Sequence, residues 1–129
     1  MSLLLLDTNV VSYLLKAHPL AERYLPLIDG HTLAISFMTV GEMYEGAFRA
    51  GWSERRLALL DACLSAYHVV PGSTALCRTW AKVRADRRAH PIAVDDAWIA
   101  ACALFLGCPL VTHNVGDFRD IDGLELISG

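Results

Sequence analysis

Four acidic residues in this sequence of 129 residues stand at the end of a predicted strand or close to the start of a predicted helix: Asp7, Glu42, Asp96 and Asp117. Carboxylates gathered in one pocket repel each other unless a cation lies among them. Oxygen donors without nitrogen or thiolate ligands favour Mg²⁺ or Mn²⁺ over zinc. Such a cation lowers the pKa of a bound water and stabilises charge on a phosphate. The pattern therefore indicates metal-dependent hydrolysis of a phosphodiester.

Each acid, taken alone, also has an ordinary structural role. Asp7 can cap the helix that follows it, and Thr8 and Asn9 are capping residue types as well. Asp95 and Asp96 suit the cap and first turn of a helix, where the helix dipole favours negative charge. Turn formation explains Asp117, and solvent exposure explains Glu42. The functional interpretation depends on their joint placement.

Short apolar runs alternate with longer helical stretches, which is typical of a parallel α/β domain. We predict strands at 3–6, 32–35, 67–70, 110–111 and 124–127. We predict helices at 10–16 and 19–28, from Ser36 to Gly51, at 53–66 and 73–88, and from Asp95 or Asp96 to Gly107.

These elements are expected to bring the acids together. The carboxyl ends of parallel strands share one edge of the sheet, so the loops carrying Asp7, Asn114 and Asp117 converge there. Asp96 can lean over the same edge. Glu42 is expected to point partly inward, because its neighbours Val40 and Met43 belong to the apolar face of their helix.

Composition favours one domain spanning residues 1–129, with no need for disulfides. The longest apolar run, 97–108, is shorter than the roughly 18 residues that span a bilayer. We expect no membrane association, no signal peptide and a cytoplasmic location. The four cysteines form no CxxC pair, so we interpret them as buried free thiols.

The net charge of −3 argues weakly against a nucleic-acid partner, yet the basic residues are unevenly distributed. Five of the 11 lie in one predicted helix: Arg78, Lys82, Arg84, Arg87 and Arg88. This segment can hold an RNA backbone or simply be solvated surface. Base stacking is open to Trp52, Trp80 and Trp98, although packing against other side chains explains them better.

Taken together, four segments in order resemble the PIN domain, and specifically its VapC-type toxins. They are Leu6-Asp7-Thr8-Asn9, Thr39-Val40-Gly41-Glu42, Asp96-Ala97-Trp98-Ile99-Ala100-Ala101, and Leu110-Val111-Thr112-His113-Asn114 with Asp117-Phe118. The resemblance covers nearly the whole chain. It implies a three-layer α/β/α sandwich with a mainly parallel sheet. It also implies a Mg²⁺- or Mn²⁺-dependent endoribonuclease, a homodimer, and a cognate antitoxin whose tail occupies the active-site groove.

By position, the resemblance makes Asp7, Glu42 and Asp96 the acidic residues of the site. Asp7 and Asp96 are expected to bind the metal directly, and Glu42 is expected to bind it through water or to orient the nucleophile. Many relatives have an acid where this chain has Asn114, so either Asn114 or Asp117 fills the fourth position. Supporting roles are expected for Thr8, Asn9 and Thr112, whereas the neighbouring Asp95 is left outside the site.

Other functions stay open at this stage. A PIN-type nuclease can act outside a toxin–antitoxin pair. A phosphotransfer domain, such as a receiver or a haloacid-dehalogenase-like phosphatase, also places an acid after its first strand. That alternative needs a lysine late in the sheet, and the only lysines are Lys16 and Lys82. A catalytically silent binding module would have lost the acids, which are present.

Overall fold

The computed structural model describes residues 2–129, and in this part of the chain five strands form one parallel sheet. The strands are β1 (Leu3–Leu6), β2 (Thr32–Ser36), β3 (His68–Val70), β4 (Leu110–Val111) and β5 (Leu126–Ile127). Their order is β3-β2-β1-β4-β5, and all four pairings are parallel. The central strand is therefore β1, which ends directly before Asp7.

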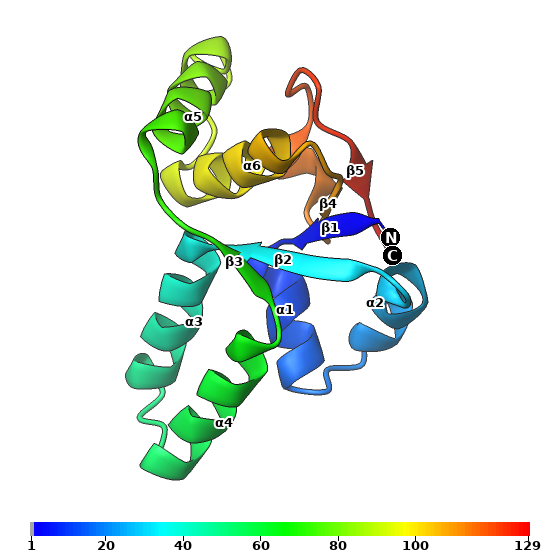
Figure 1. Ribbon diagram of the computed structural model, residues 1–129, viewed down its shortest axis with the longest axis vertical. Helices are drawn as coiled ribbons and strands as arrows, with labels where there is room; N and C mark the ends of the chain where they lie inside the picture. The colour runs from blue at the N-terminus through cyan, green and yellow to red at the C-terminus, as the bar shows by residue number, and fades with distance from the viewer. Residues whose placement is uncertain (1) are drawn as a thin grey trace.

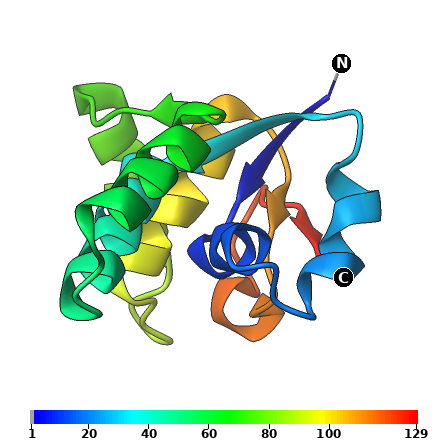
Figure 2. The same cartoon turned by 90° about the horizontal axis from the view of Figure 1, so that it is seen from below.

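Helices cover both faces of this sheet, as Figures 1 and 2 show. On one face lie α1 (Thr8–Leu15), α2 (Ala21–Ile28), α3 (Phe37–Arg49) and α4 (Glu54–Ser65), and on the other lie α5 (Thr74–Asp86) and α6 (Val94–Leu106). Side chains of β1 alternate between the two layers: Leu4 and Leu6 join the core with α1–α4, and Leu5 joins the core with α5 and α6. The predicted three-layer α/β/α sandwich is confirmed.

Serine side chains begin three of the helices at the residues where the sequence predicted a start. Ser36 Oγ accepts a hydrogen bond from Met38 N at 3.0 Å, which caps α3. Ser53 and Ser73 cap α4 and α5 in the same way. Gly107 ends α6 with φ of +65°, a conformation that favours glycine. These local signals fix where the elements begin and end.

Several sequence predictions about element ends are wrong. Helix α6 begins at Val94, and its cap Ala93 makes no side-chain hydrogen bond, so neither Asp95 nor Asp96 caps it. Both acids lie in its first turn. Asp7 caps α1, one of the capping possibilities in the sequence, but the helix begins at Thr8 and not at residue 10. The predicted helix at 73–88 ends at Asp86, and the predicted strand at 124–127 is limited to 126–127.

The cysteines also differ from expectation. All four are free thiols, but only Cys102 is buried, Cys63 and Cys108 are half-buried, and Cys77 is exposed. Cys77 lies on α5, which forms the outer layer and turns this side to solvent. No helix within residues 2–129 combines the length and apolar character that crossing a membrane requires.

Candidate active site

The carboxylate of Asp7 lies at the end of β1 and is held on both oxygens. Asp7 is only 4 % exposed. Oδ1 accepts a hydrogen bond from Thr8 N at 2.8 Å, and Oδ2 accepts one from Thr112 Oγ1 at 2.8 Å. Burial raises the pKa of Asp7 above its ordinary value, while the bonds from Thr112 and Thr8 oppose that shift. Asp7 is thus both a helix cap and a fixed, buried acid.

Glu42, in the second turn of α3, is turned toward α1 by a chain of hydroxyl groups. Thr8 Oγ1 donates to Glu42 Oε1 at 2.7 Å, and Thr8 Oγ1 lies 2.9 Å from Thr39 Oγ1. Because the Thr8 hydroxyl has one hydrogen, which it gives to Glu42, Thr39 is the donor to Thr8. Thr39 is fully buried and Glu42 half-buried. The predicted inward orientation of Glu42 is confirmed.

Two acids of the first turn of α6 face this pair. Burial raises the pKa of Asp96 to about 7, and the negative charges of Asp95, Asp7 and Asp117 add to the shift. The pKa of Glu42 is also raised to about 7, first by burial and then by a hydrogen bond and charge repulsion from Asp95. Mutual perturbation of this kind requires the four side chains to lie close together.

The loop after β4 completes the edge of the sheet and contains the 3₁₀ turn η1 (Val115–Phe118). Figure 2 shows this turn beside the start of α1. Asp7 N donates to Val111 O at 2.9 Å and Thr112 Oγ1 donates to Asp7 Oδ2, so the predicted convergence of the segments after β1 and β4 is confirmed. Asp117 is exposed, and its charge raises the pKa values of Asp7 and Asp96. Asn114 is exposed, and its backbone N–H donates to Thr112 Oγ1 at 3.0 Å.

The acids have no cationic partner in the described part of the chain. Both ion pairs found there are remote: Arg49 with Glu45, and Lys82 with Asp86. Among residues 2–129, no three His, Cys, Asp or Glu side chains come close enough to enclose a metal ion by themselves. A closed protein cage is therefore absent from this region. The oxygen donors instead fit a cation that keeps several of its waters and uses only one or two carboxylates, as Mg²⁺ does.

Arginine side chains of α5 hold the loop that leads into α6. Arg84 Nη1 donates to Ile92 O at 2.8 Å. Arg87 donates from Nε to His90 O at 2.9 Å and from Nη1 to Arg119 O at 2.8 Å. These bonds tie α5 to the loop before Asp95 and Asp96 and to the residue after η1. Two of the five predicted RNA-binding residues thus support the loops around the site.

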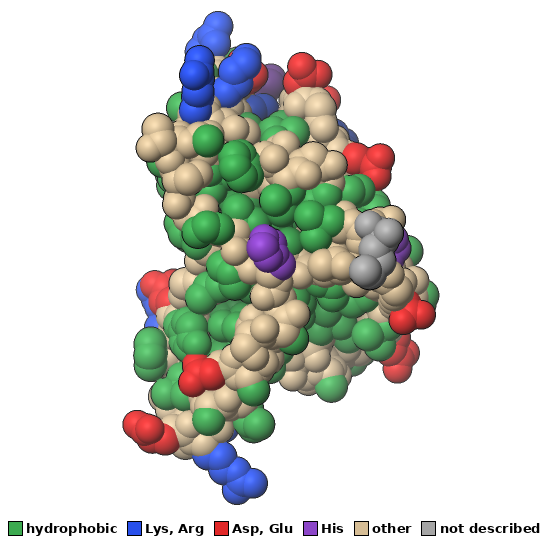
Figure 3. Space-filling view, viewed as in Figure 1, with side chains coloured by type: hydrophobic (Ala, Val, Ile, Leu, Met, Phe, Trp, Pro, Cys, Tyr) green, Lys and Arg blue, Asp and Glu red, His purple; other side chains and the backbone are tan. Residues whose placement is uncertain are grey.

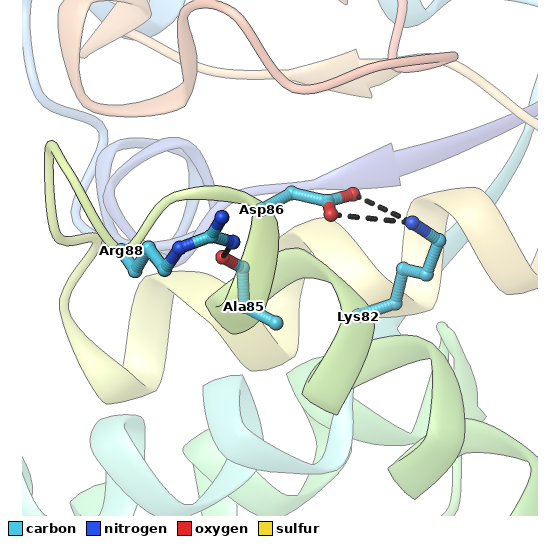
Figure 4. Close-up of polar contacts among 4 residues, drawn as sticks. All are labelled: Lys82, Ala85, Asp86 and Arg88. Atoms are coloured by element: carbon cyan, nitrogen blue, oxygen red, sulfur yellow. Dashed lines mark hydrogen bonds and ion pairs between the residues drawn. The ribbon is translucent and has the colours of Figure 1, made fainter.

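The other three basic residues of the predicted segment are exposed, two on α5 and Arg88 just after its end. Figure 4 shows Lys82 Nζ paired with Asp86 at 3.1 Å and Arg88 Nη1 donating to Ala85 O at 3.0 Å. Arg78 is exposed on the same helix. In Figure 3 lysine and arginine side chains gather at the upper left, over the end of α5. Contact of this segment with RNA stays a prediction.

Sequence reasoning missed two residues of this arrangement. Asp95 was left out because the resemblance assigns the acidic position to its neighbour Asp96, but its hydrogen bond with Glu42 places it in the cluster. Thr39 lies three residues before Glu42 in the motif Thr39-Val40-Gly41-Glu42, yet only its bond with Thr8 gives it a role. The signal available in the sequence was the pair of consecutive acids.

The fold and the site together define a three-layer α/β/α domain with a cluster of carboxylates at the carboxyl edge of its sheet. The model of the PIN domain family matches residues 4–124. The chain therefore belongs to the PIN domain family, and its relatives are VapC-type proteins.

Three comparisons illustrate this similarity. Ribonuclease VapC1 of Haemophilus influenzae (strain R2866) is 33% identical over 126 residues, covering 94% of this chain and 93% of that protein. VapBC2 from Rickettsia felis, solved bound to a DNA fragment from its promoter, has a TM-score of 0.85 at 26% identity and covers 98% of both chains. A toxin-antitoxin complex from Klebsiella pneumoniae has a TM-score of 0.76 at 25% identity, covering 95% of this chain and 94% of that one.

Proposed function

We propose that this chain is a metal-dependent endoribonuclease that hydrolyses RNA phosphodiester bonds. The observation that carries the proposal is the group of carboxylates around the buried Asp7. Glu42 and Asp96 are both raised in pKa to about 7, and no cationic side chain among residues 2–129 pairs with them. Such a group is stable in its ionised form when a divalent cation joins it. The relative named Ribonuclease VapC1 supports RNA as the substrate.

The residues fit Mg²⁺ or Mn²⁺ in a water-rich site. Asp7 and Asp96 would hold the cation, Glu42 would reach it through water, and Asp117 or Asn114 would complete the shell through water from the η1 loop. When bound, the cation lowers the pKa of a water and stabilises charge on the phosphate. Thr112 fixes the orientation of Asp7 through the 2.8 Å bond to Oδ2, and Asn9 lies beside Thr8 at the mouth of the site.

Glu42 is suited to move a proton during hydrolysis. Thr8 occupies Oε1 of Glu42, so the second carboxylate oxygen is the one open to Asp95 and to an attacking water. A carboxyl group with a pKa of about 7 is poised to accept a proton near neutral pH. We propose that Glu42 orients the attacking water and takes its proton, while Asp95 keeps the pKa of Glu42 high.

Cleavage of a mixed single-stranded RNA by the purified protein tests this function. We expect cutting in the presence of Mg²⁺ or Mn²⁺ and none in EDTA. Asp7→Ala, purified in the same way, is the matched control for contaminating nucleases. Equal cleavage by wild type and Asp7→Ala would assign the activity to another protein or another site.

We further propose that the chain is the toxin of a type II toxin–antitoxin pair and forms a homodimer. The support is the similarity to VapBC2 and to a toxin-antitoxin complex. Expression of the wild type should arrest growth, and Asp7→Ala should not. Co-expression of a small protein from the adjacent reading frame should restore growth and yield a stable complex. A wild type that cleaves RNA but needs no such neighbour would be a solitary PIN-type nuclease.

A further inference from the structure

A groove leads away from the acidic centre between α1 and α3. Thr8 and Glu42 line one end of it, and Lys16 and Trp52 line the other. Its free volume is about 190 Å³. Because α1 has 8 residues, the groove is about 12 Å long. It therefore begins at the proposed catalytic residues and continues beyond the space that one phosphate requires.

Beyond Glu42 and Met43, the residues that α3 and its C-terminal cap present to the groove are small. Gly46, Ala47 and Ala50 form this part of its wall. A Cβ atom added at Gly46 would meet no atom within 4 Å. We call this space the α1–α3 groove. A side chain at Gly46 can therefore start without a clash and would extend into the groove that this residue lines.

The far end of the groove combines an indole ring with two cations. The guanidinium of Arg56 lies 4.1 Å from the centre of the Trp52 ring. Lys16, Trp52 and Arg56 also line an adjoining cavity of about 260 Å³, so the two spaces meet around Trp52. Neither cation takes part in the ion pairs of the described residues. Both charges are therefore free to meet an anion.

We propose that the α1–α3 groove binds single-stranded RNA beside the bond that is cut. Lys16 and Arg56 contact backbone phosphates, and Trp52 packs against a base. Positively charged grooves with aromatic side chains are the usual means of binding single strands. The inference rests on the proposed nuclease function, because it places the scissile phosphate at the acidic end near Thr8 and Glu42.

The charge of the groove favours RNA over a peptide as its occupant. Its far end carries two unpaired cations, and its walls carry the hydroxyl of Ser12 and the amide of Asn9, which suit phosphate and sugar oxygens. An apolar helix of a protein partner would leave these polar groups unpaired. The groove also opens directly on the acidic centre, where a substrate must pass.

Binding of a short fluorescein-labelled single-stranded RNA, measured by anisotropy over a range of salt concentrations, tests the two cations. Measurements use Asp7→Asn protein so that the RNA stays intact. Lys16→Gln and Arg56→Gln should each weaken binding by about 3- to 10-fold and lower the salt slope by about 1. Arg55→Gln is the matched control, because Arg55 is exposed on the same helix as Arg56 and lines neither cavity.

Substitutions at Gly46 test the groove itself. Leucine and alanine are both better helix formers than glycine, so neither variant should impair folding. Gly46→Leu should weaken RNA binding by about tenfold or more and raise KM more than it lowers kcat. Gly46→Ala should have a smaller effect, because one methyl group leaves most of the groove open. Trp52→Leu should weaken binding by about tenfold, the loss expected for one stacked base.

The outcomes separate this inference from the proposed function. If the wild type cuts RNA and Gly46→Leu, Lys16→Gln and Arg56→Gln all bind and cut like it, the groove proposal is overturned while the nuclease stands. If the wild type never cuts RNA but these variants bind it less well, the groove stands and the nuclease proposal fails. Loss of antitoxin binding in Gly46→Leu, with RNA binding intact, would make the groove a protein-docking site and overturn the proposal.

Discussion

Charged residues gather at two places in this molecule, the carboxyl edge of the sheet and the C-terminal end of α5. The two groups differ in whether other groups of the protein compensate their charge. At the sheet edge, Asp7, Glu42, Asp95 and Asp96 crowd together, and the pKa values of Glu42 and Asp96 rise to about 7. At the end of α5, the guanidinium groups donate to backbone carbonyl oxygens.

This difference distinguishes charged residues with a structural role from charged residues with a functional role. The arginine donors are satisfied by the protein itself, so the folded structure explains them. Within the described residues, the only hydrogen-bond donors to these carboxylates from outside their cluster are hydroxyl and backbone groups, so this part of the structure leaves their negative charge uncompensated. Uncompensated charge at a sheet edge calls for a ligand, whereas compensated charge stabilises loops.

The largest effect is expected when Asp7, the central acid of the sheet edge, is replaced. Asp7→Asn keeps the size of the side chain but lowers its affinity for a cation. We expect cleavage of RNA to fall by about 10³-fold, the loss expected when several kcal/mol of charge stabilisation disappear. Single-turnover cleavage rates with Mg²⁺ measure this loss. If Asp7→Asn cleaves RNA at the wild-type rate, the acidic cluster takes no part in the reaction.

Metal-free stability tests whether the acids really repel one another. Unfolded aspartate has a pKa of about 3.9, and Asp96 in the folded chain has a pKa of about 7. The folded state therefore holds a proton that the unfolded state has lost, and its stability falls as pH rises from about 4 to 7. At pH 8, Asp96→Asn should be more stable than wild type by on the order of 1–2 kcal/mol, discounted because Asp96 is half-exposed.

Thermal unfolding in EDTA at pH 4 and pH 8 provides the measurement. The gain of Asp96→Asn should be present at pH 8 and absent at pH 4. Added Mg²⁺ should raise the Tm of wild type and leave Asp96→Asn nearly unchanged, because a ligand stabilises the state that binds it. If Asp96→Asn is more stable than wild type by the same amount at both pH values, the gain does not come from removing the negative charge of Asp96.

Substitution of Arg87, just after α5, should lower the stability of the fold and should not change the salt dependence of RNA binding. Arg87→Lys keeps the positive charge but loses the fork that reaches both His90 O and Arg119 O. We expect a loss of about 1–2 kcal/mol in the free energy of unfolding, with the salt slope of RNA binding unchanged. Urea unfolding and anisotropy measure the two quantities. A stable variant with a lower salt slope would make Arg87 a phosphate contact.

The smallest effect is expected at Arg78, which is exposed and takes no part in the ion pairs of the described residues. Arg78→Gln should change the free energy of unfolding by less than about 0.5 kcal/mol. If the basic segment contacts RNA, this variant should weaken binding severalfold and lower the salt slope by about 1. Unchanged RNA binding would show that Arg78 is not one of the residues that contact RNA.

Much of the fold could be predicted because its signals are local. The apolar run before Asp7 identified the central strand, and Ser36, Ser53, Ser73 and Gly107 marked helix ends through contacts within a few residues. Errors arose where local signals were weak. Two acids at the start of α6 looked like caps, yet the helix begins at Val94 without a side-chain cap.

The sequence by itself determined the position of Asp7, because a carboxylate that directly follows a buried strand is fixed by the chain around it. Only the tertiary structure decided the partners of the acids. Thr112 reaches Asp7 across 105 residues of sequence, and Asp95 faces Glu42 because of how α6 sits on the sheet. Packing of the whole core decides how each helix is rotated about its axis and which distant strands pair. The spacing of residues along the chain does not reveal either feature.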